Sequence, residues 1–448
     1  MRAQKTLTRG KVTPTLLRFA LPIFAALFLQ TLYGGVDLLV VGQFASTADV
    51  SGVSTGSILV HALTMGLSGL SMGVTILVGQ KTGDRKTEEA EKAILAGVLL
   101  FSIIGLLLSG GMVLFTVPLA RLLQAPAEAM EQTCDYIRIS GCGMLFVVLY
   151  NFLGAMYRGL GDSRTPFMAV LIACIFNVFG DLLLIQGFQL GAKGAAMATA
   201  AAQGVSVFFS LFMLFKRKLS FNRRALAFHG GYMLTELKLG IPIALQDLLV
   251  GVSFVVIQTV VNARNVVDSA GVGIGEKVCG FIMLFSSAFS QAIAAFVAQN
   301  IGAGKVKRAV TALTRGMMMA FGISSVIGVF TFLHGDLLAG IFTPDPAVMR
   351  AAHEYLKAYA IDTFLTSIMF CFVGFYNGCG KTFFVMVQGL VGAALIRIPL
   401  VFLISSFTNA TLFQIGLATP TATFVQIGLC AGYAVHLKRK QEKNAAEG

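Results

Sequence analysis

The chain has 448 residues, of which 56% are hydrophobic and only 12% are charged, and its mean hydropathy is +0.80. A soluble domain usually carries about 25% charged residues, so this composition excludes a water-soluble globule. The net charge of +13 would suggest nucleic-acid binding in a soluble protein, but in a membrane protein it is typical of basic loops on the cytoplasmic side. We therefore expect a lipid bilayer around the chain and no nucleic acid as a partner.

Twelve apolar segments follow one another along the chain. A transmembrane helix needs ~20 apolar residues to cross ~30 Å of hydrocarbon, and each segment meets that length. The sequence therefore predicts an all-α membrane protein with 12 transmembrane helices. The segments lie at residues 16–42, 53–76, 92–118, 134–156, 166–187, 193–215, 238–262, 272–298, 310–334, 354–376, 384–406 and 413–435.

The distribution of Lys and Arg predicts the orientation. The two ends and the five loops on one side hold 26 of the 34 basic residues. We expect this side to be cytoplasmic, with both termini there, in a multi-pass protein of the cell's inner (plasma) membrane. The basic stretch at 216–231 separates six spans from six. It predicts an N-terminal lobe over residues 1–215, a cytoplasmic linker over 216–237 and a C-terminal lobe over 238–448.

The two halves of the sequence resemble each other at a constant offset of 219 or 220 residues. Because each half has an even number of spans, both begin on the same side of the membrane. This predicts two six-helix lobes related by a pseudo-two-fold axis along the membrane normal, an arrangement that favours alternating access. The matching pairs are LPIFA at 21–25 and IPIAL at 241–245, VGQKTGDRK at 78–86 and VAQNIGAGK at 297–305, YIRIS at 136–140 and YLKAY at 355–359, and YRGLGD at 157–162 and YNGCGK at 376–381.

Four polar residues of the first half are predicted to reach one depth in the membrane: Asp37, Asn177, Asp181 and Thr199. An ionisable side chain within a span is costly and by default marks function. Asn177 and Asp181 are four residues apart and share one helix face. Two neighbouring carboxylates do not easily both stay ionised, which suits a proton carrier. The oxygens suit Na⁺ equally, with Asp37, Asn177 and Asp181 as its ligands.

The alternative for these residues is a hydrogen-bonded aspartate that only fixes helix packing. The repeat argues against it, because the positions that match Asp37, Asn177 and Asp181 in the second half are apolar. They are Ile257, Ile396 and Leu400. The fold therefore does not require polar side chains at these positions.

Other residues are weaker candidates. Gln246 and Asp247 could hold a cationic substrate from the second lobe, and three residues could line an apolar substrate cavity. Proline removes a helix hydrogen bond, so two prolines are candidates for conformational change, with simple kinks as the alternative. Asp362 and Arg397 are predicted as a buried ion pair, whereas Glu276 and Lys277 could snorkel to the interface. The cavity residues are Tyr33, Phe44 and Met65, and the prolines are Pro22 and Pro242.

The two six-span halves, the two prolines and three motifs together resemble the multidrug and toxic compound extrusion (MATE) family. The motifs are VDLLVVGQF at 36–44, VGQKTGDRK at 78–86 and YRGLGDSRTP at 157–166. The resemblance implies a V-shaped pair of lobes and cation-coupled export of organic, often cationic, compounds. It also implies that Asp37, Asn177, Asp181 and Thr199 correspond to the cation-binding cluster of the DinF-like branch.

We therefore expect a secondary active antiporter that exports drugs or toxic compounds in exchange for H⁺ or Na⁺. No ATPase motif occurs, so the energy would come from an ion gradient, without a cofactor. The alternative is a flippase for a lipid-linked precursor, although related flippases tend to have more spans and a lateral opening lined by basic residues. An intramembrane enzyme is not expected, and no HExxH motif occurs. We expect a monomer, and the substrate, the coupling ion and the resting conformation stay open.

Overall fold

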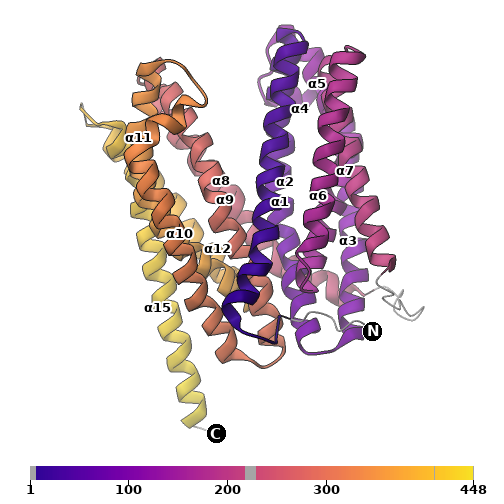
Figure 1. The fold of residues 1–448 in the computed structure, drawn as a ribbon, viewed down its shortest axis with the longest axis vertical. Coiled ribbons are helices and arrows are strands. Elements are labelled where there is room, and N and C mark those ends of the chain that lie inside the picture. The colour runs from indigo at the N-terminus through magenta and orange to yellow at the C-terminus, as the bar shows by residue number, and fades with distance from the viewer. Residues whose placement is uncertain (1–6, 217–228, 408, 447–448) are drawn as a thin grey trace. The chain divides into compact units, whose positions relative to one another are not determined.

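The computed structural model describes residues 7–216, 229–407 and 409–446. The predicted all-α architecture is confirmed: twelve helices are long and apolar enough to cross a membrane, and the described residues form no strand (Figure 1). Residues 217–228, most of the predicted linker, lie outside the described part of the chain, and the next helix begins at Gly230.

The helices follow the order of the predicted spans. In the first half they are α1 (Val12–Phe44), α2 (Thr47–Gly83), α3 (Thr87–Leu114), α4 (Thr116–Leu122), η1 (Ala127–Ala129), α5 (Met130–Gly159), α6 (Arg164–Asp181), η2 (Leu182–Gly187) and α7 (Gly191–Lys216). In the second half they are α8 (Gly230–Asn262), α9 (Val266–Gly302), α10 (Val306–Gly340), α11 (Pro346–Gly378), α12 (Thr382–Leu390), η4 (Val391–Arg397), α13 (Ile398–Ser405), α14 (Leu412–Gly416) and α15 (Ala418–Ala446).

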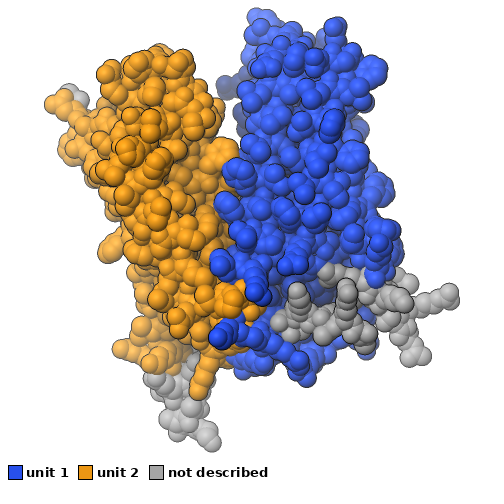
Figure 2. Space-filling model, viewed as in Figure 1, with its two compact units in different colours: residues 1–11, 17–244, 298–305 blue, residues 12–16, 245–297, 306–448 orange. Residues whose placement is uncertain are grey.

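The helices divide into two compact units, shown in separate colours in Figure 2. Unit 1 contains Leu17–Ala244, a short segment before Val12, and Ala298–Lys305. Unit 2 contains Val12–Leu16, Leu245–Val297 and the chain from Val306 onward. The division therefore cuts through helices. The first turn of α1 belongs to unit 2, and the first half of α8 belongs to unit 1. Pro22 and Pro242 lie close to the points at which these two helices pass from one unit to the other.

Four of the six pairs of corresponding spans have equal lengths. The first spans, α1 and α8, have 33 residues each, and the second spans, α2 and α9, have 37 residues each. The fourth spans have 33 residues each and the fifth 24 residues each. The predicted repeat is therefore present in the secondary structure as well as in the sequence.

The repeat extends to single contacts inside each unit. A Cβ atom added to Gly56 would lie 2.5 Å from Cδ1 of Tyr136, and one added to Gly275 would lie 2.7 Å from Cδ1 of Tyr355. These glycines let α2 and α9 approach their partner helices closely, as small residues commonly do in membrane bundles. Likewise the hydroxyl of Tyr157 donates to the carbonyl of Ser210 at 2.6 Å. That of Tyr376 donates to the carbonyl of Cys430 at 2.6 Å.

The repeated motifs YRGLGD and YNGCGK form the turns that end α5 and α11. Gly161 and Gly380 have φ angles of 81° and 74°, a left-handed conformation that glycine adopts without steric cost. The amide of Asp162 donates to the carbonyl of Tyr157 at 2.9 Å, and the amide of Lys381 donates to that of Tyr376 at 2.8 Å. This is the hydrogen-bond pattern of a Schellman helix end.

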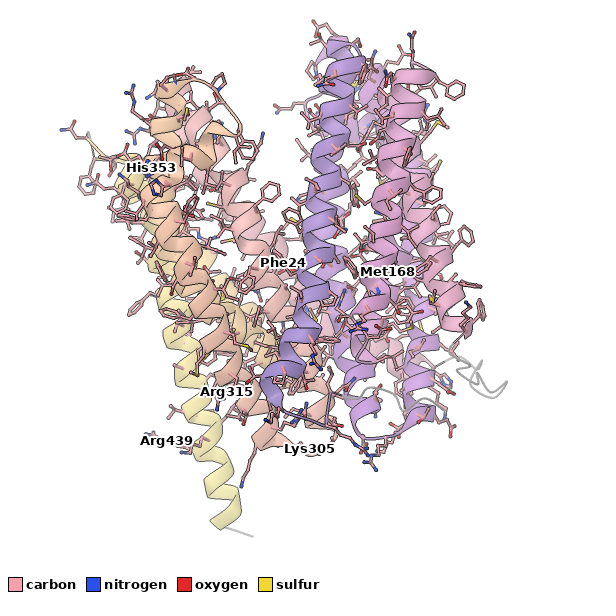
Figure 3. The ribbon with its side chains drawn as sticks, viewed as in Figure 1. Phe24, Met168, Lys305, Arg315, His353 and Arg439 are labelled. Carbon is pink, nitrogen blue, oxygen red and sulfur yellow. The ribbon has the colours of Figure 1, made fainter. Side chains whose placement is uncertain are left out.

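Two basic side chains of unit 2 lie toward the same end of its helices. Arg315 and Arg439 lie toward the lower end in Figure 3, whereas His353 lies toward the upper end. This arrangement agrees with the charge asymmetry from which the orientation is predicted.

The packing of α8 on α2 can be tested at Gly240. A Cβ atom at Gly240 would overlap the backbone carbonyl of Leu70. Overpacking of this kind costs about 1–3 kcal/mol. We expect Gly240→Ala to lower the midpoint of thermal unfolding in detergent. Gly231→Ala on the same helix is the matched control, because its added Cβ would meet nothing within 4 Å. Equal midpoints for Gly240→Ala and the wild type would contradict this packing.

Candidate functional site

The structure brings Asp37, Asn177, Asp181 and Thr199 together within unit 1. They come from α1, α6 and α7, three helices that are distant in sequence. The hydroxyl of Thr199 donates to Oδ2 of Asp37 at 3.3 Å, and Nδ2 of Asn177 donates to the hydroxyl of Thr199 at 3.2 Å. Asp37 is 7% exposed, and Asn177 and Asp181 are fully buried.

The two carboxyl groups of this cluster are neighbours that lack a common donor. Asp37 and Asp181 lie within hydrogen-bonding reach of each other. In the described chain no donor reaches either oxygen of Asp181 or Oδ1 of Asp37. Two carboxylates are both acceptors, so they can bond to each other directly only through a proton or another bound cation. A buried carboxylate with no partner costs several kcal/mol, and the pair therefore favours binding of a small cation.

A tyrosine and a glutamine extend the cluster along α1 and α7. The side-chain amide of Gln203 donates to the hydroxyl of Tyr33 at 3.0 Å. Tyr33 precedes Asp37 by four residues and Gln203 follows Thr199 by four, so each shares a helix face with its neighbour. The sequence analysis missed Gln203, although this spacing was a signal that could have identified it.

The backbone of α6 changes directly after Asp181. The α-helix ends at Asp181 and continues as η2, a π-helical segment over Leu182–Gly187. The π-helical geometry widens the turn and is frequent at functional sites. The wider turns thus begin at the residue that carries the unpartnered carboxyl group.

The remaining predicted residues lie elsewhere in their units. Phe44 ends α1 and is 43% exposed, and Met65 is half-buried on α2. Gln246 and Asp247 belong to unit 2, where Gln246 packs against Gly389 and Asp247 is half-buried on α8. Their role in substrate binding stays a prediction.

Unit 2 has a different set of polar contacts. Glu276 accepts hydrogen bonds from the hydroxyls of Tyr355 at 2.5 Å and Tyr359 at 3.0 Å. These two bonds hold the Glu276 carboxylate among the helices, in place of the predicted snorkelling to the interface.

Within the described residues Asp362 and Arg397 do not form the predicted direct ion pair, and Arg397 acts on Asp362 only through its charge. Asp362 accepts a hydrogen bond from Thr366 at 2.8 Å. Arg397 donates to Ser253 at 2.9 Å, and its guanidinium lies 4.6 Å from the ring centre of Phe254. Oδ1 of Asp362 and Nε of Arg397 have no hydrogen-bond partner among the residues that the structure describes. Both side chains are buried, as predicted, but each has its own partners.

The donor set of the unit 1 cluster suits a proton or a hard monovalent cation. The described residues include no group of three or more His, Cys, Asp and Glu side chains that could hold a metal ion. The cluster has two carboxylates, and the other oxygens, from Asn177 and Thr199, are neutral. Oxygen ligands of this kind prefer hard cations to transition metals.

Comparison with known proteins identifies the family. The sequence profile of the MatE family matches residues 22–183 and 242–403, so the two matches begin and end 220 residues apart. This double match confirms the internal repeat. The chain belongs to the MatE family, which is a family of membrane transporters and not of enzymes. The narrower assignment to the DinF-like branch stays a prediction.

Curated relatives match almost the whole chain. The probable multidrug resistance protein YoeA of Bacillus subtilis is 25% identical over 449 residues, which cover 97% of each chain. The probable multidrug resistance protein YpnP of the same organism is 27% identical and covers 89% of this chain and 90% of its own. The multidrug export protein MepA of Staphylococcus aureus strain N315 is 26% identical over 417 residues, which cover 90% of this chain and 89% of its own.

Solved structures of the family share the fold. A crystal structure of MATE in complex with MaL6 has a TM-score of 0.92 at 19% identity and covers 98% of this chain and 100% of its own. The outward-facing conformation of a multidrug resistance MATE family transporter has a TM-score of 0.91 at 19% identity, with 98% and 99% covered. At this identity the likeness supports the fold alone.

The bridge through Thr199 can be tested by its contribution to stability. Thr199→Val removes the hydroxyl that bonds both Asp37 and Asn177. Leaving buried polar groups without a partner costs about 1–3 kcal/mol. We expect a lower midpoint of thermal unfolding in detergent, with Thr199→Ser close to the wild type. Thr259→Val is the control, because the hydroxyl of Thr259 is exposed and bonds the Val255 carbonyl of its own helix. An equal loss in Thr199→Val and Thr259→Val would contradict the bridge.

Proposed function

We propose that the protein is a secondary active antiporter that exports organic, often cationic, compounds in exchange for H⁺ or Na⁺. The observation that carries this proposal is the buried Asp37–Asp181 pair, whose oxygens have no common donor and call for a bound cation. The names of the relatives YoeA, YpnP and MepA, which refer to multidrug resistance or export, support the class of substrate.

Cation binding would change the charge of unit 1 at a point where three helices meet. Uptake of one cation relieves the repulsion between Asp37 and Asp181 and draws α1 toward α6. The hydrogen bonds through Thr199 link the same change to α7. An antiporter requires that cation and substrate stabilise different conformations, so that each lowers the affinity for the other.

The helices α1 and α8 are suited to carry this change along the chain. Each of them belongs partly to unit 1 and partly to unit 2, and each has a proline close to that passage. Proline removes one hydrogen bond from the helix interior and makes bending at that point easier. We therefore assign Pro22 and Pro242 a conformational role.

The proposal places the protein as a monomer in the plasma membrane, with both termini in the cytoplasm and no cofactor. The concentration of Lys and Arg in the loops and ends of one side supports this orientation. For the substrate we assign contacts to Tyr33, Phe44 and Met65 in unit 1 and to Gln246 and Asp247 in unit 2. A carboxylate such as Asp247 would favour cationic compounds.

The role of the acidic pair can be tested with neutral isosteres. We expect Asp37→Asn and Asp181→Asn each to reduce gradient-driven efflux of a fluorescent cationic dye at least about tenfold, a typical magnitude for lost coupling. The reason is that each variant removes one of the two carboxyl groups, so the pair can no longer share a proton or hold Na⁺ between two negative charges. Asp336→Asn is the control, because its side chain is 48% exposed. Full efflux in both pair variants would contradict the proposal.

The coupling ion can be identified in proteoliposomes with a pH gradient and a Na⁺ gradient imposed separately. We expect one gradient to drive dye transport in the wild type and the same gradient to have no effect in Asp181→Asn. Proton coupling predicts that transport accelerates as the side from which protons enter is made more acidic, whereas Na⁺ coupling predicts a response at constant pH. Dye transport that responds to neither gradient would contradict cation antiport.

A further inference from the structure

A second unpartnered acid lies on the first half of α8, outside the Asp37–Asp181 cluster. The side chain of Glu236 is 1% exposed, and in the described chain neither of its carboxylate oxygens has a hydrogen-bond partner. The interactions of Asp37 and Asp181 do not include Glu236. The group is thus a buried carboxyl group that the proposed transport mechanism does not use.

The carboxyl group of Glu236 occupies a space that exists because residue 97 is a glycine. A Cβ atom added to Gly97 on α3 would lie 3.1 Å from each Glu236 oxygen and would overlap the ring of Phe152 on α5. The backbone of the same α8 segment lies against α2, since a Cβ atom at Gly73 would meet Gly240 N at 2.9 Å. The Glu236 side chain is therefore enclosed where α8 packs against α2, α3 and α5.

The charged groups of these helices do not compensate the Glu236 carboxylate. Lys81 on α2 pairs with Glu89, and its ammonium group lies 5.9 Å from the ring centre of Tyr232, one turn before Glu236. Lys92 on α3 pairs with Glu88 at 2.7 Å. The other charged groups on the elements around Glu236 are Asp49 and His61 on α2, Glu91 on α3, Glu131, Asp135, Arg138 and Arg158 on α5, and Lys238 and Asp247 on α8. Within the described residues none of these groups is a hydrogen-bond partner of Glu236.

The internal repeat shows which kind of side chain is sufficient for packing at residue 236. Gly97 corresponds to Gly316, and Glu236 corresponds to Leu16 at the offsets of 219 and 220 residues. A Cβ atom added to Gly316 would lie 3.5 Å from Cδ2 of Leu16, which is fully buried in unit 2. The same helix contact is therefore made with leucine in one half and with glutamate in the other. The fold does not require a carboxyl group at residue 236.

A buried carboxylate without a donor costs several kcal/mol, whereas the neutral acid costs much less. We propose that Glu236 is a second proton-binding site, which holds its proton while the first half of α8 packs on α3 and releases it when that contact opens. Its place in the transport cycle rests on the proposed antiport, but binding of the proton can be measured separately.

Proton binding at Glu236 can be measured by infrared titration of the purified protein in lipid bilayers between about pH 5 and about pH 9, a range in which ordinary glutamates are ionised. The wild type should show a carboxylic-acid band from a buried group above pH 5. This band should disappear in both Glu236→Gln and Glu236→Leu and persist in Asp181→Asn. Glu236→Leu copies the other half of the repeat and should unfold at or above the wild-type temperature. An unchanged band in Glu236→Leu would overturn the proposal.

The part that Glu236 plays in transport can be measured as protons moved per dye molecule in proteoliposomes. The number of protons moved per dye molecule should fall by one in Glu236→Leu and Glu236→Gln. The transport rate of these variants should also depend less on pH than that of the wild type. An equal count and an equal pH profile in the wild type and Glu236→Leu would overturn the role in the cycle. Failure of the proposed antiport is distinguishable, because Asp37→Asn and Asp181→Asn would then stay active while the Glu236 band was unaffected.

Discussion

The constraint that organises this molecule is the cost of keeping a carboxylate away from both water and hydrogen-bond donors. Within the described residues, Asp181 and Glu236 have no donor on either oxygen, and both belong to unit 1. In unit 2, Glu276 accepts hydrogen bonds from Tyr355 and Tyr359, and Oδ2 of Asp362 accepts one from Thr366. A group that already has donors gains little from a cation. Cation binding at Asp181 or Glu236 therefore changes the energy more than cation binding at Glu276.

The internal repeat separates what the fold needs from what the function adds. Packing contacts recur at the same offset, as at Gly56–Tyr136 and Gly275–Tyr355. The polar groups do not recur, because Asp181 corresponds to Leu400 and Glu236 to Leu16. The same holds in the other direction, where Glu276 corresponds to Ser57, Asp362 to Gly143 and Arg397 to Val178. Each half thus carries polar side chains that the shared architecture does not explain, and these are the residues for which a function must be sought.

The sequence predicted the spans, the repeat and the Asp37–Asp181 cluster because these depend on apolar length, constant offset and depth in the membrane. Depth in the membrane alone was not enough to predict whether Asp362 and Arg397 form an ion pair. Two residues at one depth form an ion pair only if their helices are rotated so that the side chains face each other. Glu236 was missed for a related reason. It lies close to the basic linker, where a charged residue is normally a helix end in contact with water. Its burial depends on the glycine at residue 97 of another helix, and a single sequence does not show that contact.

Glycine contacts also hold the parts of α8 and α9 that belong to unit 1. The end of α9 belongs to unit 1, where Gly83 meets the backbone of Gln299 and Gly302 meets the backbone of Gln80. These two contacts correspond to each other in the internal repeat, because Gly83 matches Gly302 and Gln80 matches Gln299. The side chain of Gln299 also donates to the carbonyl of Gly159 at 2.8 Å and accepts from the amide of Leu7 at 2.9 Å. Unit 1 therefore holds the last turn of α9 through close backbone contacts. It holds the first half of α8 through contacts that include the carboxyl group of Glu236. Of these two contacts within unit 1, that of α8 includes an ionisable side chain, so its strength can follow the proton.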